Sequence, residues 1–235
     1  MKISYLLRTS WLWLGIFVLS QGCRTGFDLA TLQPVPPSQE KLPRLMLEFD
    51  DESFDALYPI TLAQYEEYDE DQGVLYATRP QAHPRFMDLK TITERSMERS
   101  MTLASGPYYG RALLKTTHHS VERGGEIFML LSGFSMFTLN LLGMPVSNLV
   151  SVVELEMELY DARGNRLKSY IGQGTDRLWQ GFYVGSTSGN RSVHASAVKM
   201  ALLQIQEQMT DDAPMLREVF AKIGPMKSES AAQQE

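Results

Sequence analysis

The chain has 235 residues, of which 43% are hydrophobic and 21% are charged, a composition that is ordinary for a globular protein. Its 28 acidic and 22 basic residues give a formal net charge of −6 at pH 7. Such a surface repels nucleic acids and anionic lipid headgroups, so the composition argues against nucleic-acid binding. The length allows one sizeable core, or one domain with an extension.

The first 22 residues follow the order of an export signal. A basic start with Lys2 and Arg8 precedes an apolar run of about ten residues, and a small residue stands directly before Cys23. A membrane-spanning anchor needs about 20 apolar residues, so the short run favours a cleaved signal. Cys23 is the only cysteine, and a cut elsewhere would leave it as an unpaired thiol.

This arrangement resembles the signal of bacterial lipoproteins, in which a peptidase cleaves before the cysteine and lipid is attached to it. The resemblance implies a signal peptide over residues 1–22, a covalent lipid such as palmitate on Cys23, and a place in the bacterial cell envelope. Ser20 departs from the aliphatic residue that the family usually has at this position. Arg24 stands where aspartate would retain the protein at the inner membrane, which by analogy favours the outer membrane, on its periplasmic or surface leaflet.

The remaining chain divides into three parts. Four prolines and few large apolar side chains predict an extended, weakly ordered linker over residues 23–43. We expect a single α+β domain over residues 44–225. A polar, disordered tail is expected over residues 226–235.

The domain is predicted to begin with a strand, because Leu45, Leu47 and Phe49 alternate with more polar residues. Acidic residues then dominate residues 50–71 and predict a solvated loop. A calcium loop is less favoured, because its glycine would stand between the ligands and Gly73 comes after them.

Four further elements follow in chain order. Residues 74–78 predict a short strand that Arg79-Pro80 ends. Apolar residues near one face predict a helix over residues 88–103, and Gly106-Pro107 stops it. A strand is then expected over residues 108–117.

No charged residue occurs between Ile127 and Val153. The length meets the requirement of a membrane-spanning helix, but Pro145 and many small or polar residues interrupt the segment. A spanning helix would also return the C-terminal third to the cytoplasm, which conflicts with an exported start. We favour a buried hairpin or bent helix. A membrane-apposed or oligomer-forming insertion over residues 127–146 and a spanning helix remain as alternatives.

The clearest local pattern begins at Val153, where apolar residues alternate with glutamates up to Leu159 and predict a strand with one buried face. The return strand is expected over residues 167–171. A three-residue loop with Gly164 in the left-handed conformation would place Leu159 opposite Leu167 and keep apolar residues on one face.

Apolar residues at helical spacing predict a long helix from about Ser192 to Met209, which would cover this sheet. A shorter helix is expected after Pro214 and is ended by Gly224-Pro225. Together these elements predict an α+β fold in which a mostly antiparallel sheet carries a C-terminal helix on one face.

Two regions are candidate sites. His118 and His119 are neighbours, but adjacent side chains of a strand point to opposite faces, so one metal ion cannot easily take both and we expect no metal site. Free amides at the start of a helix can hold an anion, which makes a loop before Ser192 a weak candidate; its residues are Gly185, Ser186, Ser188 and Gly189. A loop with Ser192 as the helix cap is the simpler interpretation, because the phosphate-loop sequence is missing.

Neither region contains a recognised catalytic set, so we predict no catalytic residue and no cofactor besides the lipid on Cys23. The layout loosely resembles small envelope lipoproteins that act as accessory or assembly factors, which implies a non-catalytic role with protein partners in the envelope. One alternative is an oligomeric secretion or pore-assembly subunit that uses residues 127–146. A second is a periplasmic hydrolase that uses the His118-His119 pair or residues 185–189. Aromatic residues that could fill a core or form a contact surface are Tyr108, Tyr109, Trp179, Phe182 and Tyr183.

Overall fold

The structure is a computed structural model that describes residues 32–69, 73–136, 138–141, 145–180 and 186–226. Cys23, the predicted signal peptide and almost all of the predicted tail lie outside these ranges, so their predictions stay open.

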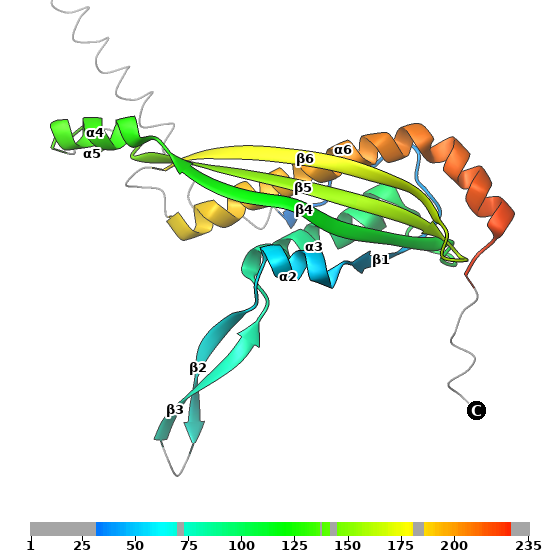
Figure 1. Ribbon diagram of the computed structural model, residues 1–235, viewed down its shortest axis with the longest axis horizontal. Coiled ribbons are helices and arrows are strands. Elements are labelled where there is room, and N and C mark those ends of the chain that lie inside the picture. The colour runs from blue at the N-terminus through cyan, green and yellow to red at the C-terminus, as the bar shows by residue number, and fades with distance from the viewer. Residues whose placement is uncertain (1–31, 70–72, 137, 142–144, 181–185, 227–235) are drawn as a thin grey trace, which may run out of the picture.

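A four-stranded sheet forms the centre of the molecule, with strand order β1-β4-β5-β6 (Figure 1). Its strands are β1 (Leu45–Phe49), β4 (Gly110–Gly124), β5 (Ser147–Asp161) and β6 (Arg166–Gln180). β1 runs parallel to β4, and the other neighbours are antiparallel. The three strands of 15 residues make the sheet about 50 Å long.

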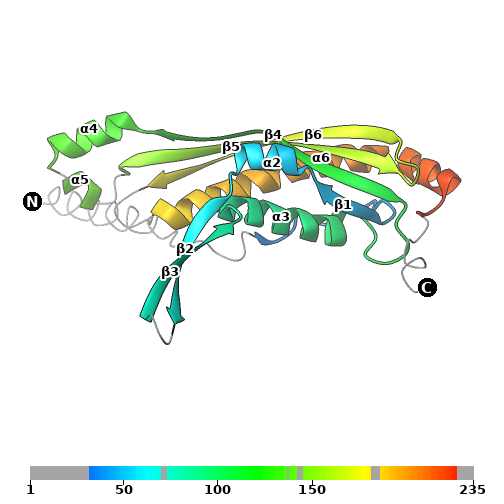
Figure 2. The same cartoon turned by 60° about the horizontal axis from the view of Figure 1, so that its bottom comes forward.

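Helices cover one face of this sheet (Figures 1 and 2). The long helix α6 (Ser186–Ile223) packs on β5 and β6, and α3 (Pro84–Ser96) lies beside α6 and continues into a π-helical turn, η2 (Met97–Met101). The prediction of an α+β fold with a mostly antiparallel sheet and a C-terminal helix on it is therefore confirmed.

The close approach of α6 to the sheet depends on glycines in β6. A Cβ atom on Gly172 or Gly174 would overlap the main-chain carbonyls of Ala201 and Ala197, which lie on successive turns of α6. The backbone of α6 therefore lies directly against the backbone of β6 at these two glycines. Fully buried apolar side chains from both layers fill the space around this contact, among them Val153, Leu155, Met157, Val198, Leu202 and Ile205.

The hairpin between β5 and β6 corrects the predicted register. Gly164 has the expected left-handed φ of +83°, and the Asp161 carboxylate accepts hydrogen bonds from the main-chain N–H groups of Arg163 and Asn165. However, Leu159 pairs with Lys168 instead of Leu167, because a bulge shifts the register directly after the turn. The shift turns Tyr170 toward α6 and leaves it 1% exposed.

The prediction of a solvated loop in the acidic stretch is wrong. Most of this stretch folds into helix α2 (Asp51–Leu57) and strand β2 (Thr61–Asp69). Phe54 is buried and anchors α2 to the core. β2 pairs with β3 (Gly73–Gln81) in a hairpin that projects from the body (Figures 1 and 2). The short strand predicted over residues 74–78 lies within β3.

The prediction of a weakly ordered linker is wrong for residues 33–43. This segment is extended, as predicted, but it packs against the domain. Val35 and Leu42 are buried, and Ser100 Oγ donates a hydrogen bond of 2.6 Å to the Val35 carbonyl. The Leu42 N–H donates to the Met101 carbonyl at 3.0 Å. Prolines keep this segment extended, while its two apolar side chains fill a gap in the core.

The two predicted C-terminal helices are one helix, which starts at Ser186 instead of Ser192 and contains Pro214. Leu216 and Phe220, which follow the proline, are fully buried, so packing against the core favours a helix that continues past Pro214. The C-terminal part of α6 bends away from its first part (Figure 1). The helix predicted over residues 88–103 corresponds to α3 and η2, and the strand predicted over residues 108–117 lies within β4 except for its first two residues.

Candidate functional site

The uncharged segment forms two short helices that connect β4 to β5 and extend beyond the end of the sheet (Figure 1). They are α4 (Glu126–Phe134) and α5 (Thr138–Leu141). We call residues 126–136 and 138–141 the apolar tip.

The apolar tip exposes its large side chains, so the favoured prediction of a buried core is wrong for this part. Phe134 is 88% exposed, Met136 is 85% exposed and Leu130 is 64% exposed. Further exposed apolar residues of the tip are Ile127, Met129, Leu131, Leu139 and Leu141. The tip extends beyond the end of the sheet, and the first turns of α6 lie along the sheet and not along the tip (Figure 1).

One side of α4 nevertheless faces the body. The Phe128 ring packs edge-on against Trp179 of β6, with 5.4 Å between ring centroids, and Ser132 is buried. Gly125 starts α4 in a left-handed conformation with φ +94°, which allows the chain to turn sharply out of β4. These contacts hold α4 in a defined orientation.

Charged and aromatic groups surround the base of the tip. Arg177 of β6 lies over the Trp179 ring at 6.0 Å from its centroid, and Trp179 is 46% exposed. Arg123, near the end of β4, and Glu126, the first residue of α4, are both exposed, and both lie close to the base of the tip along the chain. Polarity therefore changes sharply between the end of the sheet and the tip.

No helix among the described residues is long and apolar enough to cross a bilayer. The predicted alternative of a spanning helix is therefore unsupported within residues 126–136 and 138–141. The alternative of an exposed insertion over residues 127–146 agrees with the arrangement of the described part.

A second group of functional side chains gathers at the root of the β2–β3 hairpin. The Tyr58 ring stacks on His119 at 4.9 Å, and the His119 and His194 rings meet at 4.8 Å. His83, which caps α3, lies 6.0 Å from Tyr58. Sequence reasoning missed this group, because its members lie just after α2, just before α3, in β4 and in α6, and no local spacing relates them.

Burial keeps these imidazoles neutral at pH 7. It lowers the pKa of His119 to about 4 and that of His194 well below its usual range, and the nearby Arg85 guanidinium acts in the same direction. Burial also raises the pKa of Tyr58. Tyr58 Oη lies 3.5 Å from His194 Nε2, and within the described ranges no serine or carboxylate is hydrogen-bonded to either imidazole.

The predicted pair His118 and His119 is split, since His118 is exposed and His119 belongs to the buried group. Within the part of the chain that the structure describes, no group of three metal-binding side chains is assembled.

The candidate anion loop is only partly described. Gly185 lies outside the described residues, and residues 186–189 are the first residues of α6 instead of a loop before it. Ser186 lies eight residues before His194 on α6, or about 12 Å along the helix. The structure therefore does not bring the Ser186 backbone to the histidines.

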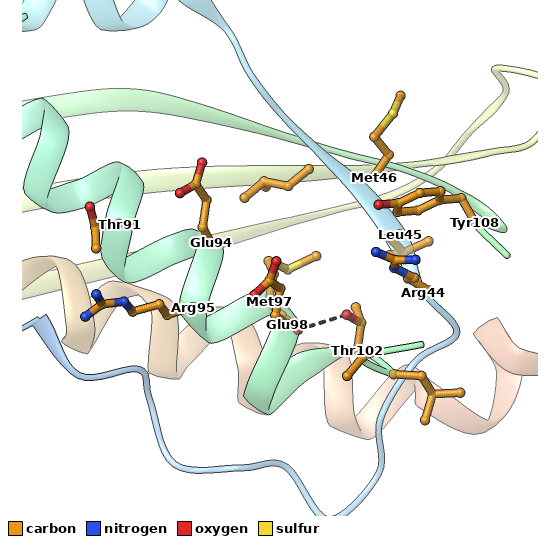
Figure 3. A pocket seen from close by; sticks show the side chains of 13 residues that line it. Arg44, Leu45, Met46, Thr91, Glu94, Arg95, Met97, Glu98, Thr102 and Tyr108 are labelled. Carbon is orange, nitrogen blue, oxygen red and sulfur yellow. Dashed lines mark hydrogen bonds between the residues drawn. The ribbon is translucent and has the colours of Figure 1, made fainter. Parts of the chain in front are cut away.

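A groove between α3, η2 and β1 is a further concave feature of the part of the chain that the structure describes (Figure 3). Glu94 and Glu98 stand on its helical wall, while Arg44 lies on the opposite side and stacks over the Tyr108 ring at 4.3 Å. Charges of both signs line it and face solvent, so the groove has no net preference for an ionic ligand.

No protein-family model matches this chain, and no curated protein is significantly similar to it. The site that stands out on physical grounds is the apolar tip. Its exposure is unusual for a folded domain, whereas the histidine group and the groove resemble ordinary parts of one.

Proposed function

We propose that this chain is a non-catalytic lipoprotein of the bacterial cell envelope that acts as a binding or assembly factor. The exposed apolar tip supports this proposal most directly. Soluble monomers rarely expose a contiguous patch of large apolar side chains, and such patches mark interaction sites. The tip is consequently the contact element of the proposed function.

The lipid anchor predicted at Cys23 fits this role. The chain is packed against the domain from Leu32 onward, so only residues 24–31 separate the predicted anchor from the body. Eight residues span at most about 30 Å, which is less than the length of the sheet. An anchored domain would thus remain close to the membrane surface.

The histidine group favours a non-catalytic role. Tyr58 and His194 are buried, and the half-buried His119 ring packs on both with its Nε2 enclosed, whereas a general base would need access to substrate. The hydrolase alternative uses the His118-His119 pair or residues 185–189. The two regions do not form one catalytic set, because Ser186 lies about 12 Å along α6 from His194, which packs on His119.

A second candidate is a subunit of an oligomeric secretion or pore assembly that uses residues 127–146. The same exposed side chains favour it, because apolar surfaces also join subunits. Size measurement of the purified protein in detergent separates the two: a defined ring or oligomer supports the assembly subunit, and a monomer opposes it.

Mass spectrometry of the processed N-terminus, after growth with labelled fatty acid, tests the lipoprotein part of the proposal. We expect a chain that begins at an acylated Cys23, and a Cys23→Ser variant that carries no label. A wild-type chain that keeps residues 1–22, or a free Cys23 thiol, would overturn the proposal.

Cross-linking in intact envelopes tests the contact role of the tip. A double variant Leu130→Ser/Phe134→Ser should lose the cross-linked species of the wild type. The matched control Leu103→Ser/Met215→Ser changes apolar residues that are also exposed, but elsewhere on the domain. Equal cross-linking of all three proteins would rule out the tip as a contact with another protein.

A further inference from the structure

We infer that the partner of the apolar tip is the hydrocarbon region of one leaflet of a lipid bilayer. This inference rests on the proposed function, because it names what the contact element touches. A second protein or a second copy of the chain would be the other occupants, and four features of the tip favour lipid over both.

The first feature is how the exposed side chains are distributed around α4. Successive residues of a helix are rotated by about 100°. Ile127, Met129, Leu130, Leu131 and Phe134 therefore cover more than half of its circumference, and all are exposed. A partner helix or groove covers one face, whereas acyl chains surround every side that the body leaves free.

The second feature is that the tip satisfies its own hydroxyl groups. Ser132 Oγ donates to the Phe128 carbonyl at 2.7 Å, Ser135 Oγ to the Ser132 carbonyl at 3.2 Å, and Thr138 Oγ1 to the Ser135 carbonyl at 2.6 Å. Internal satisfaction of polar groups is a requirement in hydrocarbon, where no water competes. A protein interface instead uses about one hydrogen bond per 100–200 Å².

The third feature is a pair of residues on β6 at the base of the tip. Trp179 and Arg177 stack on each other where the apolar surface ends. Tryptophan concentrates at the membrane–water interface, and arginine can keep its charge in the headgroup region while its stem covers apolar surface. Their position matches the level at which headgroups would lie if the tip were inserted.

The fourth feature is length. The nine residues of α4 span about 14 Å, roughly half of the ~30 Å hydrocarbon core of a bilayer. The tip can therefore enter one leaflet without crossing. The anchor predicted at Cys23 would supply the proximity, and insertion would give the domain a second point of attachment and a fixed orientation.

The tip has one charged residue, Glu126 at its base, and no lysine or arginine, and the whole chain has a net charge of −6, so insertion would depend on apolar contact and not on attraction to anionic lipid. We therefore expect insertion in vesicles of phosphatidylcholine alone, and no increase when anionic phosphatidylglycerol is added, because the negative net charge repels its headgroups.

Depth-dependent fluorescence quenching on the full chain tests the inference. Cys23 is kept, because its acylated thioether has no free thiol, so a single environment-sensitive label can be attached at Leu130→Cys or at Phe134→Cys while the anchor is retained. Matched labels at Leu103→Cys and Met215→Cys report on exposed apolar positions away from the tip. All four positions are exposed, so labelling should not disturb the core. Each protein is reconstituted into phosphatidylcholine vesicles with either spin-labelled lipid or aqueous iodide as quencher.

We expect spin-labelled lipid to quench both tip labels several-fold more than the control labels, and iodide to show the reverse order. Tip labels that are shielded from both quenchers would indicate a protein contact, which would overturn the lipid partner and leave the proposed function standing. Tip labels that iodide reaches as easily as the controls would overturn the lipid partner and the contact role together.

Discussion

Arg191 of α6 and Asp88 of α3 form a two-point ion pair, in which Arg191 Nε donates to Asp88 Oδ2 at 2.9 Å and Nη2 donates to Oδ1 at 2.7 Å. Asp88 is buried, whereas the arginine is partly exposed. The pair joins the two helices that cover the sheet, close to the end that carries the apolar tip. It is thus one of the contacts that set the position of the first turns of α6.

Breaking this pair should destabilise the domain. We expect Asp88→Asn to lower the free energy of unfolding by about 2–3 kcal/mol, since a buried, bidentate partner of arginine loses its charge. Urea unfolding followed by circular dichroism measures the change. The control Glu218→Gln removes an exposed ion pair with Lys222 and should cost less than about 0.5 kcal/mol. Similar costs for both variants would contradict this interpretation of the Asp88 pair.

The stability of the domain should also depend on the size of the side chain at position 174, where β6 touches Ala197 of α6. A Cβ at Gly174 would overlap the Ala197 carbonyl, so Gly174→Ala must push α6 from the sheet and should cost about 1–3 kcal/mol of unfolding free energy. Gly133→Ala in α4 is the matched control, because a Cβ there meets no atom within 4 Å. The control should leave stability unchanged or raise it by up to about 1 kcal/mol, as alanine favours helix. An unchanged unfolding free energy in Gly174→Ala would show that the contact between β6 and α6 is not tightly packed.

The histidine group predicts loss of stability in acid. The pKa of His119 is about 4 in the fold and near 6.5 in the unfolded chain, so the unfolded state binds more protons between these values. Stability should therefore be constant above about pH 6.5 and fall as the pH drops toward 4. Tyr58, His83, Arg85 and His194 surround the ring, and none is an acid that could offset its protonation.

Urea unfolding between pH 7.5 and pH 4.5 measures this dependence. His119→Phe should flatten the profile because it removes one titrating ring and keeps an aromatic stack with Tyr58. The neighbouring variant His118→Phe changes an exposed ring and should keep the slope of the wild type. An unchanged slope in His119→Phe would assign the acid sensitivity to other groups.

The exposed side chains of the tip should contribute to binding and contribute little to the unfolding free energy of the domain. Leu130→Ser/Phe134→Ser removes two side chains that are mostly exposed, so the unfolding free energy should stay within about 0.5 kcal/mol of the wild type. The same variant should bind less detergent, which light scattering coupled to size-exclusion chromatography measures. A large loss of stability would mean that these side chains pack in the native protein after all.

Much of the central sheet could be predicted because its signals are local. The alternation from Val153 to Leu159 identifies β5, helical spacing identifies α6, and Gly164 identifies the turn, since each pattern follows from backbone geometry within a few residues. The register beyond the turn could not be predicted, because a bulge of one residue leaves no mark in the pattern.

The amino-acid sequence by itself determined the fold class and located the long apolar segment, because hydrophobic periodicity and charge are properties of neighbouring residues. Only the tertiary structure decided that most of the large apolar side chains within residues 127–136 are exposed, that Val35 and Leu42 are buried, and that His119 meets His194. Burial depends on what covers a side chain, and the covering elements lie far away along the chain. The same apolar pattern can therefore mean a core or a surface until the long sheet and its shorter cover are placed in space.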